Sequence, residues 1–183
     1  MTFIAALLAA ATLSGSAEAA DRCRPLVPPS LAKEIATTYP GHRLPRGNDQ
    51  DTYNVQYNLE HGGSGCLGVA TGDFDGDKRR DVALLLTAKD RPEGLLVVAL
   101  RRGTKWLLEL VETVEAAIRT QYVDTVGPGE YGPGPLWGES QPLPNEMKVI
   151  KSSTEGVVTG TLESTGLYYF RLNDKWRFVW THD

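Results

Sequence analysis

The spacing of apolar residues changes at Cys66, from the spacing of helices to the short runs of strands. Before this point, Ser30 is placed to cap a helix over residues 31–36. Asp51 is placed in the same way to cap a second helix over residues 52–60. Both predicted helices are short, so they depend on packing rather than on intrinsic propensity.

After Cys66, short apolar runs are bounded by Gly, Pro and Asp and recur roughly every 10 residues, which is typical of an antiparallel meander. The runs at 82–86 and 95–100 are almost continuously apolar, so we expect both at the centre of a sheet with both faces covered. The predicted strands are residues 67–70, 82–87, 95–100, 106–111, 122–126, 147–151, 157–162, 167–172 and 176–181. The predicted fold class is α+β, with two short N-terminal helices on a twisted, mainly antiparallel β-sheet in a single domain.

Three connecting segments carry expectations of their own. Residues 112–119 are predicted as a helix, and Asn173-Asp174 as a hairpin turn. Residues 127–145 form a loop rich in Pro and Gly, and long loops of this kind tend to be functional or mobile. Within it, Tyr131 and Trp137 are the large side chains available for a partner; the alternative is that they fix the loop to the body of the protein.

The N-terminus has the pattern of a secretory signal peptide over residues 1–20. An apolar stretch at 3–13 is followed by small residues at 14–20, which predicts cleavage near Ala20. The apolar stretch is shorter than the roughly 20 residues that a membrane span needs, so we expect no span in the mature chain. The mature protein is therefore predicted to be periplasmic or secreted.

Cys23 and Cys66 are the only two cysteines of the chain. In the oxidising compartment that a signal peptide implies, they are predicted to form a disulfide. The alternative is a pair of buried free thiols.

Composition and motifs argue against several classes of function. A chain of 183 residues without a 20-residue leader has the length of one domain. Its net charge of −4 argues against a nucleic-acid binder, which normally carries a basic patch. The three histidines lack the spacing of a zinc site, and the chain contains no phosphate loop, dinucleotide fingerprint or nucleophile elbow. We therefore expect no catalytic activity.

The richest chemistry lies in the run Gly72-Asp73-Phe74-Asp75-Gly76-Asp77-Lys78-Arg79-Arg80-Asp81, between two predicted strands. Alternate carboxylates on a curled loop can bring several oxygen atoms to the distance of about 2.3–2.6 Å that Ca²⁺ requires. Without a cation, four clustered carboxylates repel one another. The alternative is a solvated acidic turn whose charge is offset by the neighbouring basic residues 78–80.

Residues 72–83 resemble the FG-GAP repeat of integrin α chains, also called the VCBS repeat, whose acidic loop runs into a Leu/Val-Ala strand. The resemblance implies side-chain ligands at Asp73, Asp75, Asp77 and Asp81, and a backbone carbonyl ligand at Arg79. Lys78 stands where the family usually has Gly, which costs about 1 kcal/mol in a left-handed conformation. Only one copy is present, and a propeller needs at least four blades, so no full propeller is expected.

An EF-hand does not fit the same residues. Lys78 occupies the position of its central Gly, and Leu84 occupies the position of its bidentate Glu. The wider chain resembles small exported bacterial proteins. These features predict an exported Ca²⁺-binding interaction module that contacts another protein or a component of the cell envelope. The alternative is a periplasmic inhibitor or immunity-type protein that blocks a cell-wall hydrolase or toxin through loop 127–145.

Overall fold

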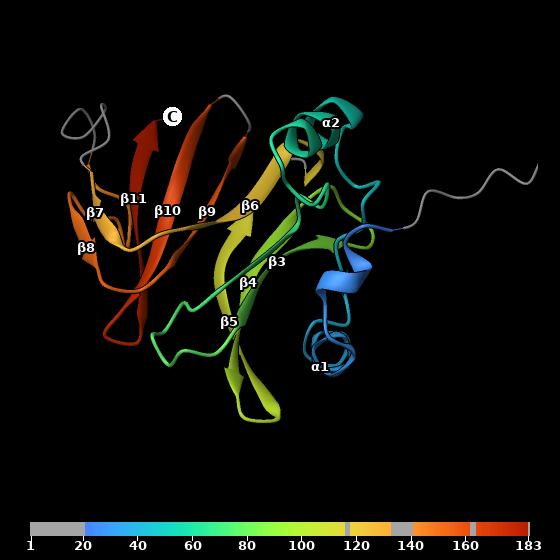
Figure 1. Ribbon diagram of the computed structural model, residues 1–183, viewed down its shortest axis with the longest axis horizontal. Coiled ribbons are helices and arrows are strands. Elements are labelled where there is room, and N and C mark those ends of the chain that lie inside the picture. The colour runs from blue at the N-terminus through green and yellow to red at the C-terminus, as the bar shows by residue number, and fades with distance from the viewer. Residues whose placement is uncertain (1–20, 116–117, 133–140, 162–163, 183) are drawn as a thin grey trace, which may run out of the picture.

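The computed structural model describes residues 21–115, 118–132, 141–161 and 164–182. These residues form two antiparallel sheets that lie face to face (Figure 1). A helix covers the outer side of the first sheet, and a two-stranded ribbon covers the outer side of the second. The α+β class with mainly antiparallel sheets is confirmed, but the strands predicted to form one sheet are divided between two sheets and the two-stranded ribbon.

In the first sheet the order is β1-β3-β4-β5, and β2 pairs with the same edge of β3 as β1 does. The second sheet has the order β11-β10-β9-β6, and β7 pairs with β8. The strands of the first sheet are β1 (His42–Arg43), β2 (Val69–Gly72), β3 (Asp81–Ala88), β4 (Gly94–Arg102) and β5 (Lys105–Val114). The remaining strands are β6 (Gln121–Val126), β7 (Gly129–Tyr131), β8 (Ile150–Ser152), β9 (Gly156–Thr161), β10 (Thr165–Leu172) and β11 (Lys175–His182).

The helical segments are η1 (Arg24–Leu26), α1 (Pro29–Thr38), α2 (Thr52–Glu60) and η2 (Ile118–Thr120). The helix α1 buries Leu31 and Ile35 against the first sheet, whereas α2 has no buried residue. Within the described ranges, none of the helices is both long and apolar enough to cross a membrane.

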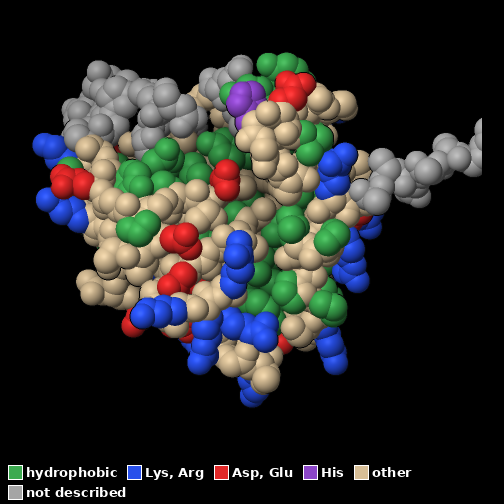
Figure 2. Space-filling model, viewed as in Figure 1, with side chains coloured by type: hydrophobic (Ala, Val, Ile, Leu, Met, Phe, Trp, Pro, Cys, Tyr) green, Lys and Arg blue, Asp and Glu red, His purple; other side chains and the backbone are tan. Residues whose placement is uncertain are grey.

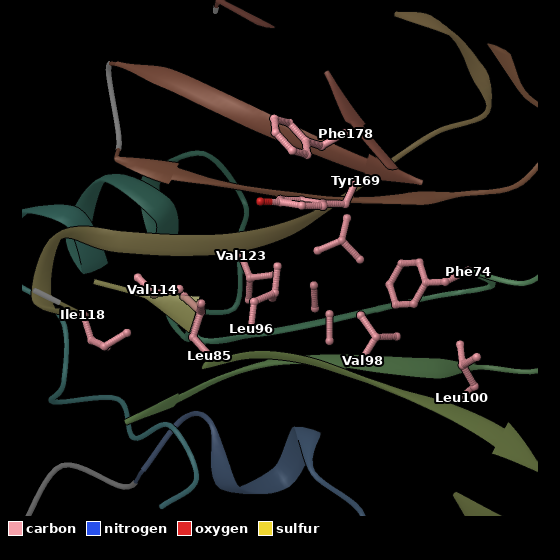
Figure 3. Packing of buried hydrophobic residues seen from close by; sticks show 13 residues of the cluster. Phe74, Leu85, Leu96, Val98, Leu100, Val114, Ile118, Val123, Tyr169 and Phe178 are labelled. Atoms are coloured by element: carbon pink, nitrogen blue, oxygen red, sulfur yellow. The ribbon is translucent and has the colours of Figure 1, made fainter. Parts of the chain in front are cut away.

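The central strands β3 and β4 are covered on both faces, as predicted. Leu85 and Val98 face the second sheet, where Tyr169 belongs to the same core (Figure 3). On the opposite face, Leu84 and Val97 pack in the cluster that α1 covers. All four aliphatic side chains are fully buried.

The two helix caps differ in outcome. Asp51 caps α2 as predicted, because its Oδ1 accepts hydrogen bonds from the backbone N–H groups of Tyr53 (2.9 Å) and Asn54 (3.4 Å). The prediction for Ser30 is wrong: α1 begins two residues earlier than predicted, with Pro28 at the N-cap and no side-chain cap. The Ser30 Oγ instead accepts a hydrogen bond from Trp106 Nε1 (3.1 Å), a partner that is distant in sequence.

Two connecting segments also differ from expectation. The predicted helix over 112–119 is wrong at its start, because β5 continues to Val114; Glu112 there accepts a hydrogen bond from the Tyr169 hydroxyl of the second sheet (2.6 Å). Loop 127–145 contains the strand β7, which pairs with β8. The turn at Asn173-Asp174 is confirmed, since both residues have positive φ and join β10 to β11.

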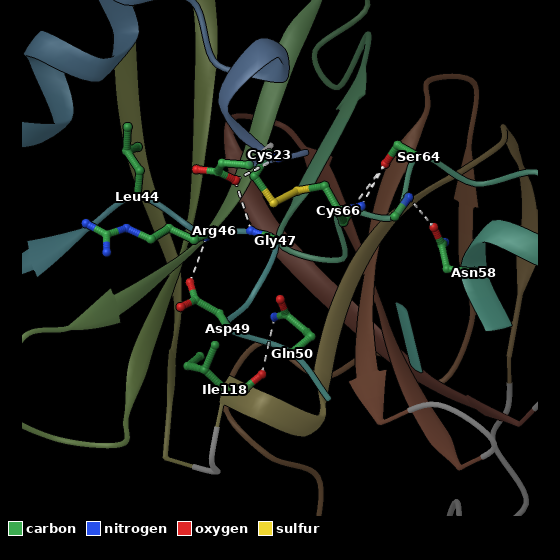
Figure 4. The surroundings of a disulfide bond; sticks show 12 residues. Cys23, Leu44, Arg46, Gly47, Asp49, Gln50, Asn58, Ser64, Cys66 and Ile118 are labelled. Atoms are coloured by element: carbon green, nitrogen blue, oxygen red, sulfur yellow. Dashed lines mark hydrogen bonds between the residues drawn. A yellow bond between two sulfur atoms is a disulfide. The ribbon is translucent and has the colours of Figure 1, made fainter. Parts of the chain in front are cut away.

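The disulfide between Cys23 and Cys66 is confirmed, with a Cα–Cα distance of 5.0 Å. It fixes the N-terminal segment to the residues before β2, and both cysteines are buried (Figure 4). Asp21 strengthens the same junction, because its Oδ1 accepts hydrogen bonds from the backbone N–H groups of Cys23 (3.1 Å) and Gly47 (3.0 Å).

Removing this bond should destabilise the protein, because it closes a loop with a sequence separation of 43 residues. Loop-closure entropy for that length is about 4 kcal/mol. We expect the double variant Cys23→Ala/Cys66→Ala to lower the free energy of unfolding in urea by this order. Thiol labelling of the denatured wild-type protein should find no free cysteine; two labelled cysteines, or an unchanged urea midpoint in the double variant, would contradict the prediction.

Candidate metal centre

The acidic loop connects β2 to β3 and closes their antiparallel pairing, in which Gly72 lies opposite Asp81. The loop brings together the carboxylates of Asp73, Asp75 and Asp81. One oxygen atom from each of the three lies within 4.8 Å of the others, which is a spacing that could hold a metal ion. Figure 2 shows acidic and basic side chains gathered at the lower left of the molecule, around this loop.

Hydrogen bonds from the backbone curl the loop around its own carboxylates. The N–H of Lys78 donates to Asp73 Oδ2 (3.0 Å), the N–H of Asp77 to Asp75 Oδ1 (3.2 Å), and the N–H of Arg79 to Asp77 Oδ1 (2.8 Å). The curl requires positive φ at Gly76 (78°) and at Lys78 (65°). Lys78 therefore adopts the left-handed conformation for which glycine is better suited.

Asp81 is the most enclosed member of the cluster and is 0% exposed. Its two carboxylate oxygens accept hydrogen bonds from the backbone N–H groups of Phe74 (3.0 Å) and Arg101 (2.7 Å). Burial raises the pKa of Asp81 to about 6, and the nearby charges of Asp75 and Asp77 add to the rise, although the two backbone bonds oppose it. The site thus contains a carboxylate for which a cation would be a favourable neighbour.

One carboxylate oxygen of Asp73 receives no hydrogen bond from the loop. Its Oδ1 is buried and has no hydrogen-bond partner among the described residues. Buried polar atoms in folded proteins normally have a partner, so such an atom calls for an explanation. A cation coordinated by carboxylate oxygens would supply the missing interaction, and an oxygen-only ligand set is the kind that Ca²⁺ and Mg²⁺ prefer. The residues present therefore fit a hard divalent cation.

Asp77 lies beside the guanidinium of Arg102. Its Oδ2 is 3.3 Å from Nη1 of Arg102, and the same nitrogen is 2.5 Å from Oδ2 of Asp75. Arg102 ends β4, and its guanidinium contacts two of the four predicted side-chain ligands.

Arg79, predicted as a carbonyl ligand, contributes a backbone N–H to Asp77 and has its side-chain Nε 4.0 Å from Asp77 Oδ2. The role of its carbonyl stays a prediction.

A fifth carboxylate comes from the turn that leads into β9 of the second sheet. Oε2 of Glu155, on the turn between β8 and β9, accepts a hydrogen bond from the backbone N–H of Asp73 (2.5 Å). The neighbouring Thr154 lies close to the loop as well, since a Cβ on Gly76 would be 2.9 Å from its Cγ2. Glu155 was not predicted, because nothing in its local sequence distinguishes it from other surface glutamates.

The predicted partner-binding residues lie elsewhere. Tyr131 packs on the outer face of the second sheet, with its ring stacked on Phe170 at a centroid distance of 5.0 Å and its hydroxyl donating to the Gly127 carbonyl (2.7 Å). These contacts fix this part of the loop to the body of the protein. Trp137 lies outside the described residues, as does the predicted signal peptide 1–20.

The chain matches no protein-family model, no curated protein and no solved structure. The resemblance to the FG-GAP repeat accordingly continues to depend on residues 72–83 alone and stays a prediction. A metal centre is supported instead by the three converging carboxylates and by the buried oxygen of Asp73 that lacks a hydrogen-bond partner.

The raised pKa of Asp81 should make the stability of the metal-free protein depend on pH. In the unfolded chain this carboxyl has an ordinary pKa of about 4, so the folded state binds its proton more tightly. This stabilisation is complete below about pH 4 and is lost as the pH rises through about 6. Between about pH 4.5 and 7.5 we expect a loss of about 2 kcal/mol in the free energy of unfolding of metal-depleted protein.

The control is Asp81→Asn, which has a similar shape and no charge at any pH. Its overall stability should differ from that of the wild type, but its pH profile over the same range should lack the Asp81 contribution. Parallel profiles for the two proteins would show that Asp81 does not titrate in this way.

Proposed function

We propose that this chain is an exported Ca²⁺-binding interaction module without catalytic activity. The observation that carries the proposal is the convergence of Asp73, Asp75 and Asp81 around a buried oxygen of Asp73 that lacks a hydrogen-bond partner. The resemblance of residues 72–83 to the FG-GAP repeat points to the same ion. Asp77 and the backbone carbonyl of Arg79 would complete the set of ligands on the loop.

Ca²⁺ is favoured over Mg²⁺ by the nature of the loop. Mg²⁺ demands near-ideal octahedral geometry and gives up its water reluctantly, whereas Ca²⁺ accepts six to eight oxygen atoms in variable arrangements. Most ligands come from the curled loop itself, and Glu155 offers a further carboxylate from the turn before β9. An oxygen-rich site whose ligands come from separate segments suits the larger ion.

The ion would act on the fold where three elements meet. The loop itself joins β2 to β3, Asp81 accepts a hydrogen bond from the backbone of Arg101 at the end of β4, and Asp73 donates to Glu155 beside β9. A bound cation would hold these contacts in one arrangement and so fix the surface around the loop for a partner. The disulfide supports the export part of the proposal, since such bonds persist in oxidising compartments.

Calcium should stabilise the folded protein by binding it in preference to the unfolded chain. At a hundredfold excess over Kd the gain is about 2.7 kcal/mol, which corresponds to a rise of several degrees in Tm. We expect this rise in thermal unfolding at millimolar Ca²⁺, a smaller one with Mg²⁺, and no response in Asp75→Asn. The matched control is Asp90→Asn, an exposed aspartate on the β3–β4 turn, which should respond like the wild type.

Absence of any calcium effect up to about 10 mM, well above the range of extracellular modules, would overturn the proposal. An equal response in Asp75→Asn and in the wild type would place the ion elsewhere.

Two substitutions should tighten calcium binding. Arg102→Gln removes the guanidinium that contacts Asp75 and Asp77, and Lys78→Gly relaxes a left-handed residue while removing a positive charge. We expect each to lower the Kd for Ca²⁺ several-fold in calorimetric titration. Lys105→Gln removes the same charge from the exposed start of β5 and should change the Kd much less; a Kd equal to that of Arg102→Gln would mean that only net charge matters.

A further inference from the structure

A second candidate site lies around the N-terminal segment, away from the acidic loop. It is a hollow of about 810 Å³, a volume within the range of small-molecule pockets. Its walls come from the residues beside the disulfide, from the segment before α2, from the first turns of α2 and from η2. Figure 4 labels Arg46, Asp49 and Gln50 of this lining. The charged residues of the lining are Asp21, Arg22, Arg46, Asp49 and Arg119.

The two acidic side chains of this hollow are already neutralised or satisfied. Asp49 accepts two hydrogen bonds from the guanidinium of Arg43 (2.7 Å each) and one from the backbone N–H of Arg46 (2.7 Å). Asp21 Oδ1 accepts the two backbone hydrogen bonds that hold the N-terminal segment in place. Neither acid therefore forms an ion pair with the arginines that line the hollow.

Those arginines have no such partners. The side chains of Arg22, Arg46 and Arg119 make no ion pair or hydrogen bond with any other described residue, and all three residues are exposed. Their positions are nevertheless fixed by the backbone: Arg22 precedes the disulfide-bonded Cys23, and the Arg119 carbonyl accepts a hydrogen bond from the Asp51 N–H (3.1 Å). The hollow thus has a surplus of positive charge on a chain whose net charge is −4.

Gln50 adds an unmatched acceptor to the wall. It is 6% exposed, and its Nε2 donates two long hydrogen bonds to the carbonyls of Ile118 and Gln121 (3.4 Å each). Its Oε1 is buried without a hydrogen-bond partner in the described structure. Gln50 lines the hollow, and this oxygen is an acceptor of its wall that has no donor among the described residues.

We propose that this hollow binds a small oxyanion, a carboxylate or a phosphate, that carries a hydroxyl group close to its charge. Guanidinium groups match both oxyanions with paired, charge-assisted hydrogen bonds, and three of them surround the hollow. The hydroxyl group is the donor that Gln50 lacks. The site is independent of the calcium loop and does not depend on the function proposed for it.

The experiment is calorimetric titration of the disulfide-bonded protein at constant ionic strength. The probes are D-glucuronate, acetate, inorganic phosphate and D-glucose. We expect saturable 1:1 binding of glucuronate, weaker binding of acetate because it has no hydroxyl group, and no binding of neutral glucose. Phosphate binding tighter than that of glucuronate would assign the site to phosphate esters. If neither glucuronate nor phosphate saturates below about 20 mM, or if glucose binds as well as glucuronate, the proposal is wrong.

Variants locate the binding. Arg46→Gln and Arg119→Gln should each raise the Kd for the bound anion about tenfold, which is about 1.4 kcal/mol. Arg91→Gln removes the same charge from the β3–β4 turn, where Arg91 pairs with Glu93, and should leave the Kd unchanged. Equal losses in all three variants would reveal a general effect of net charge and overturn the site. The calcium response of every variant should match the wild type, so the two sites can fail separately.

Discussion

The fold is governed by two strands that cannot face water on either side. Leu84 and Val97 point to one face of β3 and β4, Leu85 and Val98 to the other, and all four are fully buried. Exposing such side chains would cost about 2 kcal/mol each, so both faces must be covered by separate layers. One cover is α1, which is tethered through the N-terminal segment to the disulfide, and the other is the second sheet. This arrangement also sets the position of the acidic loop, because the loop leads directly into β3.

The closure of the two sheets also determines the electrostatics of the loop. Phe74, in the middle of the acidic run, is part of the core between the sheets, and its N–H holds the buried carboxylate of Asp81. The Asp75 side chain is only 4% exposed. A solvated acidic turn would leave these groups in water, where their repulsion is screened. Here they are withdrawn from water, so their charge must be met by backbone N–H groups, by Arg102 or by a cation.

The sequence predicted what local patterns encode and missed what distant contacts decide. The runs of β3 and β4, the cap at Asp51 and the pairing of the two cysteines each follow from nearby residues or from elimination. Glu155 reaches Asp73 across 82 residues, and Arg102 reaches Asp77 across 25, so neither contact leaves a local signal. The helix predicted over 112–119 is wrong at its start for the same reason: Glu112 is held in β5 beside Tyr169 of another sheet, a partner 57 residues away.

The contact between Arg102 and the loop bears on where a calcium site of this kind would be useful. A cation entering the loop must compete with a guanidinium that already contacts Asp75 and Asp77, and the loop itself carries the positive charge of Lys78. Both effects weaken binding, towards the range of about 10⁻⁴–10⁻³ M that is typical of extracellular modules. Such a site would fill only where calcium is abundant, which is outside the cytosol. The Cys23–Cys66 disulfide independently favours an oxidising compartment, so a weak calcium site and the covalent bond would suit the same surroundings.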